Sequence, residues 1–326
     1  MDISFIRSSS FNTYDLCQMQ YFLVYILGWQ EKTGVASTKG TIVHKALELL
    51  AKAKLAEQCN IDYFTDDTLG NKPFSLIEND IHTNETVDYF YDKSFDYYLK
   101  KEQSDFTDKE RRECHRWVYK VIDDGFYDPR KLNIVYPEKK FDIPIEKDWA
   151  KLSDGEYLRV KGTIDLTLRS NNTYEICDWK TGKRKNWATG NYKTNDDLQD
   201  DFQLRLYHYA IRKLYPDIKD VLVTINYIND GGPVTVAFDD SNFEITESKI
   251  HSQFVKIKNC IKPKRKQNGQ HWFCKRVCSF GKNKHNNGQQ TQCEFITNNL
   301  KLNSMSNTVQ QHTAKGFKID YYEDPG

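Results

Sequence analysis

The chain of 326 residues has no long apolar run, no pattern of a cleaved signal peptide and a mean hydropathy of −0.75. A membrane span needs about 20 consecutive apolar residues, so we expect a soluble cytoplasmic protein without a membrane partner. The chain also lacks a strong net charge, which is only +1 at pH 7, so no global basic field indicates a nucleic-acid partner. A Walker-type phosphate loop is absent too, which excludes ATP hydrolysis by that route.

Two short segments carry the first chemical signal. Side chains alternate along strands, so in residues 160–168 Asp165 lies opposite the apolar face, and in residues 174–180 Asp178 and Lys180 share a face. The polar, Asn-rich turn between the segments predicts a hairpin that brings Asp165 close to Asp178. Two carboxylates and an ammonium placed in this way suit a divalent metal held against a phosphodiester. The alternative is a surface hairpin with solvated charges.

Two predicted helices contribute further polar pairs. His44 and Glu48 lie four residues apart in a segment whose apolar residues recur at helical spacing. Gln203 and Tyr207 have the same separation in a helix that we predict over 197–214. Each pair also has a structural interpretation, because a helix histidine often packs or caps and a helix tyrosine often belongs to the core.

The order of these motifs resembles that of the RecB-like exonucleases of the PD-(D/E)XK nuclease superfamily, which include the CRISPR-associated adaptation exonuclease and the AddB nuclease domain. The resemblance covers about residues 8 to 293 and rests on five groups of residues: Ser10, Tyr14, Cys17 and Tyr21; Gly40 and His44; Gly162 and Asp165; Asp178–Gly182; and Gln203 and Tyr207. It implies an α/β fold with a restriction-endonuclease-like core, in which helices flank a mixed central sheet.

The resemblance also implies a metal-dependent DNA exonuclease with assigned site residues. The implied ligands of Mg²⁺ or Mn²⁺ are His44, Asp165, Asp178 and the backbone carbonyl of Trp179. Carboxylate oxygens suit either ion, and a neutral imidazole favours Mn²⁺. Lys180 would be the catalytic lysine, and Gln203 and Tyr207 would contact the substrate backbone or brace Lys180. Glu138, just before a predicted strand, is interpreted as a surface residue, with a water-mediated contact to the site as the alternative.

Eight cysteines in a reducing compartment indicate metal ligands or buried thiols rather than disulfides. Cys274, Cys278 and Cys293 lie in a segment that we expect to be a loop, and Cys17 is near the N-terminus. One cysteine before the core and three after it resemble the iron-sulfur subgroup of the family, which implies a 4Fe-4S cluster joining both ends of the domain. The gap before Cys293 is longer than in that subgroup, and an insertion explains it, since loop-closure cost grows slowly with length.

A structural zinc site is the alternative, with Cys260 replacing Cys17 beside the same three cysteines. The other cysteines, Cys59, Cys114 and Cys177, are interpreted as small buried hydrophobic residues.

Positive charge is concentrated locally. No acidic residue occurs between Lys249 and Cys293, and a second basic stretch follows the predicted catalytic strand. The first stretch is a candidate for phosphate contacts, with Trp272 and Phe273 as candidates for base stacking, or else an ordinary solvated face. The second stretch, which includes Trp187, is a candidate path that leads the DNA strand toward the metal. The candidate DNA-binding residues are Lys183, Arg184, Lys185, Lys264, Arg265, Lys266, Lys275 and Arg276.

We expect one nuclease domain without internal repeats. Residues 1–130 would be its helical N-terminal part with an acidic loop at 60–84, and 131–240 its catalytic core. A helix and the basic cysteine-rich segment would occupy 241–300, and 301–326 would be a polar, acidic tail. The expected substrate is DNA with single-stranded ends, in recombination, repair or replication, with a helicase or recombination partner. The alternatives are a catalytically silent DNA-binding subunit and an endonuclease of the same superfamily.

Overall fold

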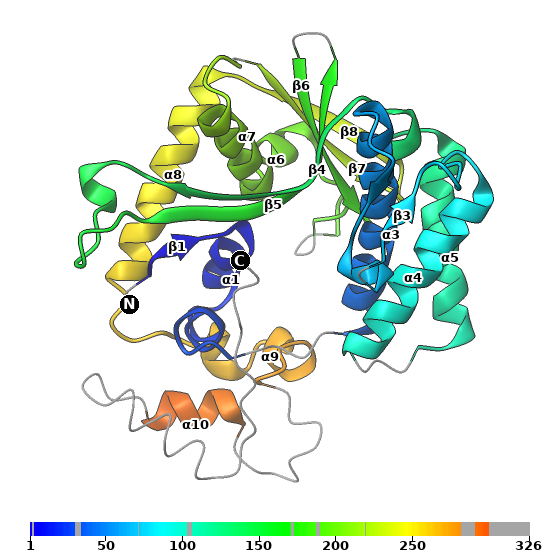
Figure 1. Cartoon of the computed structure of the whole chain (residues 1–326). Coiled ribbons are helices and arrows are strands. Elements are labelled where there is room, and N and C mark those ends of the chain that lie inside the picture. Colours follow the sequence, from blue (N-terminus) through cyan, green and yellow to red (C-terminus); the bar gives the residue numbers. More distant parts are fainter. Residues whose placement is uncertain are drawn as a thin grey trace. The chain divides into compact units, whose positions relative to one another are not determined.

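The computed structural model describes residues 1, 3–29, 34–70, 72–102, 106–170, 173–186, 190–218, 220–281 and 291–299. The chain divides into two compact units, of which the first comprises residues 1–32, 144–161 and 247–326, and the second residues 33–143 and 162–246. The architecture is α/β with a mixed central sheet and flanking helices, as the sequence predicts (Figure 1). Trp187 and the predicted tail 301–326 lie outside the described residues.

The second unit is built on the sheet, in which the strand order is β5-β6-β7-β8 and β4 also pairs with β5. The pair β5–β6 is antiparallel, β6–β7 is parallel and β7–β8 is antiparallel. A parallel pair needs a crossover, which α6 and α7 provide between β6 and β7. The bounds are β4 (Ile134–Pro144), β5 (Arg159–Ser170), β6 (Thr173–Lys180), α6 (Asn195–Gln199), α7 (Phe202–Leu214), β7 (Val221–Tyr227) and β8 (Gly232–Phe238), with a short 3₁₀ turn at Pro129–Lys131. A further 3₁₀ turn, at Asp148–Ala150, belongs to the first unit.

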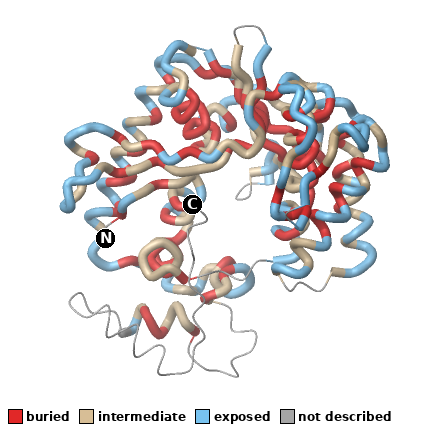
Figure 2. Tube along the Cα trace, viewed as in Figure 1, coloured by how far each residue is buried: buried red, intermediate tan, exposed pale blue. Residues whose placement is uncertain are grey.

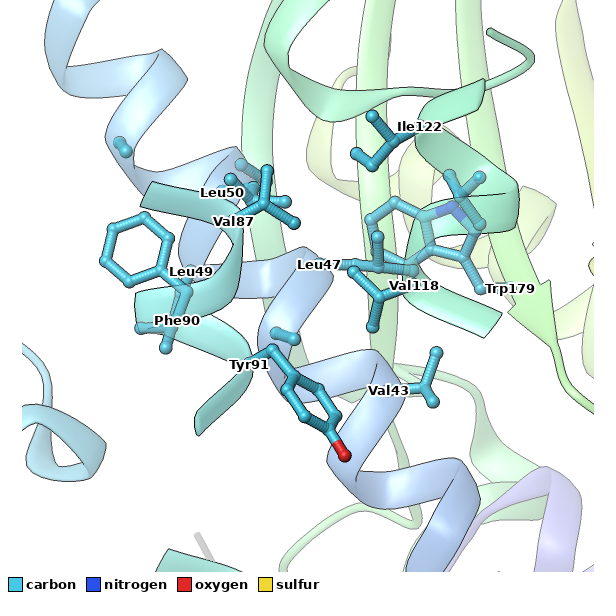
Figure 3. Packing of buried hydrophobic residues seen from close by; sticks show 14 of the residues in the cluster. Val43, Leu47, Leu49, Leu50, Val87, Phe90, Tyr91, Val118, Ile122 and Trp179 are labelled. Carbon is cyan, nitrogen blue, oxygen red and sulfur yellow. The ribbon is translucent and has the colours of Figure 1, made fainter. Parts of the chain in front are cut away.

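Three helices precede the sheet in the second unit: α3 (Val35–Gln58), α4 (Asn84–Glu102) and α5 (Asp108–Asp124). The sequence of α3 is rich in Ala, Leu, Lys and Glu, which favour helix, and its apolar side chains are buried. Figure 3 shows Leu47 of α3, Val118 of α5 and the indole of Trp179 on β6 within one hydrophobic cluster. Burial of side chains of this size stabilises by about 1.5–3 kcal/mol each. The cluster therefore fixes β6 against the helix that carries His44.

The segment 60–84 was expected to be an acidic loop, and it contains more structure than that. It forms the short hairpin β2 (Tyr63–Phe64) and β3 (Phe74–Ser75) with a 3₁₀ turn at Asp67–Leu69 between them. The rings of Phe64 and Phe74 each pack against Phe90 of α4. Packing of these aromatic side chains thus gives the segment regular structure, although most of its residues are polar.

The single helix predicted over 197–214 is two helices, α6 and α7. Asp201 adopts an extended conformation, and its side chain accepts a hydrogen bond of 2.9 Å from the backbone N–H of Gln203. A short acidic side chain that bonds the backbone in this way favours a helix start over a helix interior. Gln203 is therefore in the first turn of α7.

The first unit contains β1 (Phe5–Ile6), which pairs in parallel with the start of β5. Its helices are α1 (Ser8–Leu16), α2 (Gln18–Tyr21), a π-helical turn at Phe22–Ile26, most of α8 (Asp240–Lys258), a 3₁₀ turn at Lys266–Gly269, α9 (Trp272–Arg276) and α10 (Gln292–Asn299). Cys274 and Cys293 lie in α9 and α10, although the sequence suggested a loop. Figure 2 shows buried positions within both helices and strands. In the described part of the chain, no helix is long and apolar enough to span a membrane.

Candidate functional site

Asp165 and Asp178 lie on adjacent strands at the point where regular pairing ends. The last paired residues are Leu166 of β5 and Cys177 of β6, and the two aspartates are the next residues along each strand. The backbone N–H of Trp179 donates to Asp165 Oδ2 over 3.0 Å. Both aspartates are buried, and Asp178 is only 1% exposed. The hairpin thus brings together the two carboxylates that the sequence singled out.

Asp178 has three side-chain partners. The Lys180 ammonium lies 2.7 Å from Oδ2, while Gln203 Nε2 and the Tyr207 hydroxyl each donate to Oδ1 over 3.1 Å. Gln203 Nε2 also lies 2.6 Å from the Tyr207 oxygen. In this structure, the glutamine and tyrosine of α7 therefore brace the aspartate on β6, whereas the resemblance placed them on the substrate or on Lys180.

His44 lies against the second aspartate, with Nδ1 3.2 Å from Asp165 Oδ2. Its helix approaches the end of β6 closely at Gly40, where an added Cβ would lie 3.2 Å from the Thr181 hydroxyl oxygen. A glycine one turn before His44 therefore lets α3 pack near the end of β6, which explains why Gly40 and His44 occur together.

The charges of the site alter one another's pKa values. Burial opposes protonation of His44, but the charge and hydrogen bond of Asp165 outweigh it, so the pKa of His44 is raised. Burial raises the pKa of Asp165, but His44 and Lys180 reverse this effect and the net pKa is lowered. For Asp178, burial together with Asp165 raises the pKa despite Lys180. Burial lowers the pKa of Lys180, but Asp178 and Asp165 raise it overall and favour the ammonium form.

A cleft of about 480 Å³ opens beside these groups. Its wall includes the first turns of α3 and the end of β6, and it is lined by Ala36, Ser37, Gly40, Thr41, His44, Lys45, Glu48, Tyr98, Glu138, Lys180, Thr181 and Gly182. The cleft gives solvent-side access to His44 and Lys180, where a phosphodiester could approach.

Glu138 is a cleft residue, not the surface residue that we expected. It lies within β4 with a positive φ of 46°, a backbone conformation that costs energy for a non-glycine residue. Burial, followed by the charges of Asp165 and Glu48, raises the pKa of its carboxyl to about 8. Strand alternation gave no sign of this placement, because the irregular backbone at Glu138 interrupts it.

A charged network supports α3 below His44, and sequence analysis missed it. Lys45 Nζ lies 2.9 Å from both Glu48 Oε1 and Asp66 Oδ2, and Lys52 contacts the same two carboxylates at 2.5 and 2.6 Å. Two cations and two buried anions balance in this arrangement. Asp66 comes from the segment that was expected to be a loop, so only the fold could bring it to the helix.

Comparison with known families identifies the superfamily to which this fold belongs. The family model for the PD-(D/E)XK nuclease superfamily matches residues 8–282, most of the chain. The chain belongs to the PD-(D/E)XK nuclease superfamily. No curated protein matches it. A solved structure from Eubacterium rectale, called a "Putative exonuclease", is 11% identical and has a TM-score of 0.45, with 80% of this chain and 84% of that chain covered.

PD-(D/E)XK nucleases typically use Mg²⁺ or Mn²⁺, and the donor types of the site suit these ions. Asp165 and Asp178 supply carboxylate oxygens, each with more than one lone-pair site, so Asp178 can keep its hydrogen bonds and still act as a ligand. In the described part of the chain, no three His, Cys, Asp or Glu side chains are gathered as in a ready-formed metal site. Instead, His44 is paired with Asp165, and Asp178 with Lys180.

In the first unit, four cysteines line one cavity of about 130 Å³: Cys17, Cys274, Cys278 and Cys293. Gly281 lies against Cys274, since an added Cβ would be 2.6 Å from its carbonyl oxygen. Cys260 does not line this cavity but lines a neighbouring groove with Cys17. Of the cysteines interpreted as buried, Cys114 and Cys177 are so, but Cys59 is exposed because it follows the last turn of α3.

The candidate DNA-binding residues of this nuclease differ in their exposure. Lys183, Lys185, Lys264, Lys275 and Arg276 are exposed, while Arg184, Arg265 and Lys266 are partly buried. Arg265 forms an ion pair of 3.3 Å with Glu294. Trp272 is exposed, but Phe273 is buried in the core beside the cysteines and is not available for base stacking.

Proposed function

We propose that the protein is a metal-dependent DNA exonuclease of the RecB-like type that degrades single-stranded ends in recombination, repair or replication, with a helicase or recombinase as partner. The observation that carries the proposal is the constellation of Asp165, Asp178 and Lys180 beside His44 at an open cleft. Burying the two carboxylates is costly, so a catalytic use is a better explanation than a scaffold role.

In the proposed mechanism, Asp165 and Asp178 would hold the cation from adjacent strands, and His44 and the Trp179 carbonyl would complete the protein ligands. A cation bound there would supply Lewis-acid polarisation of a phosphoryl oxygen and would lower the pKa of a bound water. Gln203 and Tyr207 keep the Asp178 carboxylate oriented through their hydrogen bonds. Lys180, whose pKa is raised, offsets negative charge that develops on the phosphate and orients the attacking water.

We further propose that Cys17, Cys274, Cys278 and Cys293 bind a 4Fe-4S cluster. The shared cavity supports this set, because it brings one N-terminal and three C-terminal thiols to a space larger than a single ion requires. The zinc alternative needs Cys260, which lines a different groove. The cluster would connect α2 with α9 and α10 and so stabilise the first unit.

Degradation of linear and closed circular single-stranded DNA, with Mg²⁺ or Mn²⁺, tests the proposed activity. We expect loss of the linear strand only, no loss with Lys180→Met, and normal activity with Asp196→Asn, which changes an exposed carboxylate outside the cleft. Cutting of the circle would instead establish an endonuclease. DNA binding without cleavage would favour the silent subunit.

Iron and acid-labile sulfide content after anaerobic purification tests the cluster. We expect both in the wild type, their loss in Cys17→Ser, and their retention in Cys59→Ser, which replaces an exposed thiol outside the cavity. Stoichiometric zinc in place of iron would contradict the cluster proposal.

A further inference from the structure

A short basic hairpin follows the catalytic strand β6 directly. Its described arms are residues 183–186 and 190–193, which we call the exit hairpin. Lys193 N–H donates to the Arg184 carbonyl over 3.1 Å, Lys185 and Tyr192 form a β-bridge, and Asn186 N–H donates to the Asn191 carbonyl over 2.7 Å. The arms are therefore paired backbone rather than an irregular loop.

The exit hairpin is anchored to the rest of the second unit at its base. The backbone N–H of Arg184 donates to Asp230 Oδ2 over 2.7 Å, and the guanidinium Nε donates to the Lys193 carbonyl over 2.9 Å. Lys193 Nζ lies 3.1 Å from Asp201 Oδ2, on the residue that begins α7. Through Asp201 the hairpin is connected to the helix whose Gln203 holds Asp178.

Tyr192 projects from this anchored hairpin with 57% of its surface exposed. Its hydroxyl donates to Asp230 Oδ1 over 3.3 Å, and the Lys185 ammonium lies 5.1 Å from the ring centroid. The hydrogen bond to Asp230 fixes the hydroxyl end of the Tyr192 ring, and the Lys185 ammonium lies over the ring. A large exposed aromatic side chain that is already oriented loses little conformational entropy when a partner stacks on it.

We propose that the exit hairpin binds unpaired DNA, with Tyr192 as a platform on which a base stacks. Proteins that bind single strands combine such aromatic platforms with cations along the sugar-phosphate backbone. Lys185 provides such a cation beside Tyr192, and the exposed Lys183, two residues earlier on the same arm, provides a second. Bases within a duplex are already stacked on their neighbours, so the platform favours unpaired strands. This inference rests on the proposed nuclease function and adds a residue, Tyr192, that selects single-stranded DNA over duplex DNA.

Binding of a labelled single-stranded oligonucleotide in the presence of a chelator, which prevents cleavage, tests the platform. We expect Tyr192→Ala to weaken binding by about tenfold or more, since a stacked base contributes on the order of 1–3 kcal/mol. Tyr192→Phe keeps the ring and should bind within about threefold of the wild type. Tyr63→Ala is the matched control, because Tyr63 is 61% exposed and belongs to a different hairpin, that of β2 and β3.

An abasic strand of the same length separates stacking from other losses. We expect the wild type to bind it about tenfold more weakly than the natural strand, and Tyr192→Ala to weaken that binding no further. If Tyr192→Ala binds the natural strand as tightly as the wild type does, the platform is wrong while the nuclease proposal stands. If the wild type neither binds nor cleaves any DNA, both proposals are wrong.

Discussion

At the scale of single residues, the carboxylate of Asp178 forms one ion pair and accepts two side-chain hydrogen bonds. Lys180, Gln203 and Tyr207 all contact it, and it is almost fully buried. The sequence motif predicted that these residues belong to one site, but it could not show which group each side chain contacts. That required the orientation of α7 relative to β6.

Tyr207→Phe removes one of these contacts with little change in volume. A hydrogen bond to a charged group contributes about 1.5–3 kcal/mol, so we expect kcat to fall by about 10- to 100-fold with a smaller change in KM. Steady-state kinetics with thermal unfolding measure this. Tyr209→Phe, on the same helix but stacked on Phe243, should keep normal kcat. Equal losses in both variants would show that α7 acts only as structure.

His208 predicts how stability depends on pH. It is fully buried against Phe238, and neither ring nitrogen has a hydrogen-bond partner within the described part of the chain. Burial, assisted by the charge of Arg212, lowers the pKa of His208 to about 4. Between pH 6.5 and 4, the unfolded chain therefore binds more protons at this residue than the folded chain, and folding stability falls as pH falls.

The expected loss at His208 is about 3 kcal/mol across that pH window, since each pKa unit corresponds to about 1.4 kcal/mol. Denaturant unfolding of wild type and His208→Phe at pH 4 to 7 measures it. The variant should lose less stability on acidification by about this amount. Identical pH profiles would mean that His208 protonates freely in the folded state.

At the scale of elements, the packing of β4 on β5 depends on Gly162. An added Cβ would lie 2.5 Å from Cζ of the buried Phe141, which is closer than two non-bonded carbon atoms approach in proteins. We expect Gly162→Ala to destabilise the fold by about 1–3 kcal/mol, the usual cost of overpacking. Gly182→Ala, where no atom lies within 4 Å, is the control and should cost far less. Chemical denaturation of both variants decides whether the glycine is required for packing.

The elements themselves were largely predictable, and their exceptions have identifiable causes. Alternation along β5 and β6 gave the hairpin, and helical spacing gave α3. The break before α7 was missed because apolar periodicity continues through Asp201, although its capping chemistry is visible in the sequence. The hairpin of β2 and β3 was missed because its stability comes from Phe90, a residue distant in sequence.

At the scale of the whole molecule, a net charge of +1 gives little long-range attraction for DNA, so binding must depend on local basic surfaces. Lys256, Lys262, Lys264 and Lys266 line an open groove of about 630 Å³ in the first unit. Composition indicated this basic segment, but it could not show that Phe273 is buried or that Cys260 lies apart from the other cysteines. Those facts follow from the hydrophobic core of the unit.

Replacing Lys264 and Lys266 by Gln should make DNA binding less dependent on salt. Each phosphate contact on a single strand contributes about −0.7 to the slope of log affinity against log salt concentration, so the double variant should lose about 1.4 from the slope. Titrations at several salt concentrations measure it. Lys139→Gln with Lys140→Gln, on β4, should leave the slope unchanged. An unchanged slope in the groove variant would exclude the groove as a DNA contact.

The central claim is that the carboxylate of Asp178 is required for metal-dependent DNA cleavage. The most direct measurement compares wild type and Asp178→Ala on end-labelled DNA with Mg²⁺ or Mn²⁺, with DNA binding measured on the same preparations. Our account predicts that the variant loses cleavage and keeps binding, because the change removes a metal ligand and leaves the basic surfaces intact. Cleavage by the variant at the wild-type rate would contradict the proposed active site.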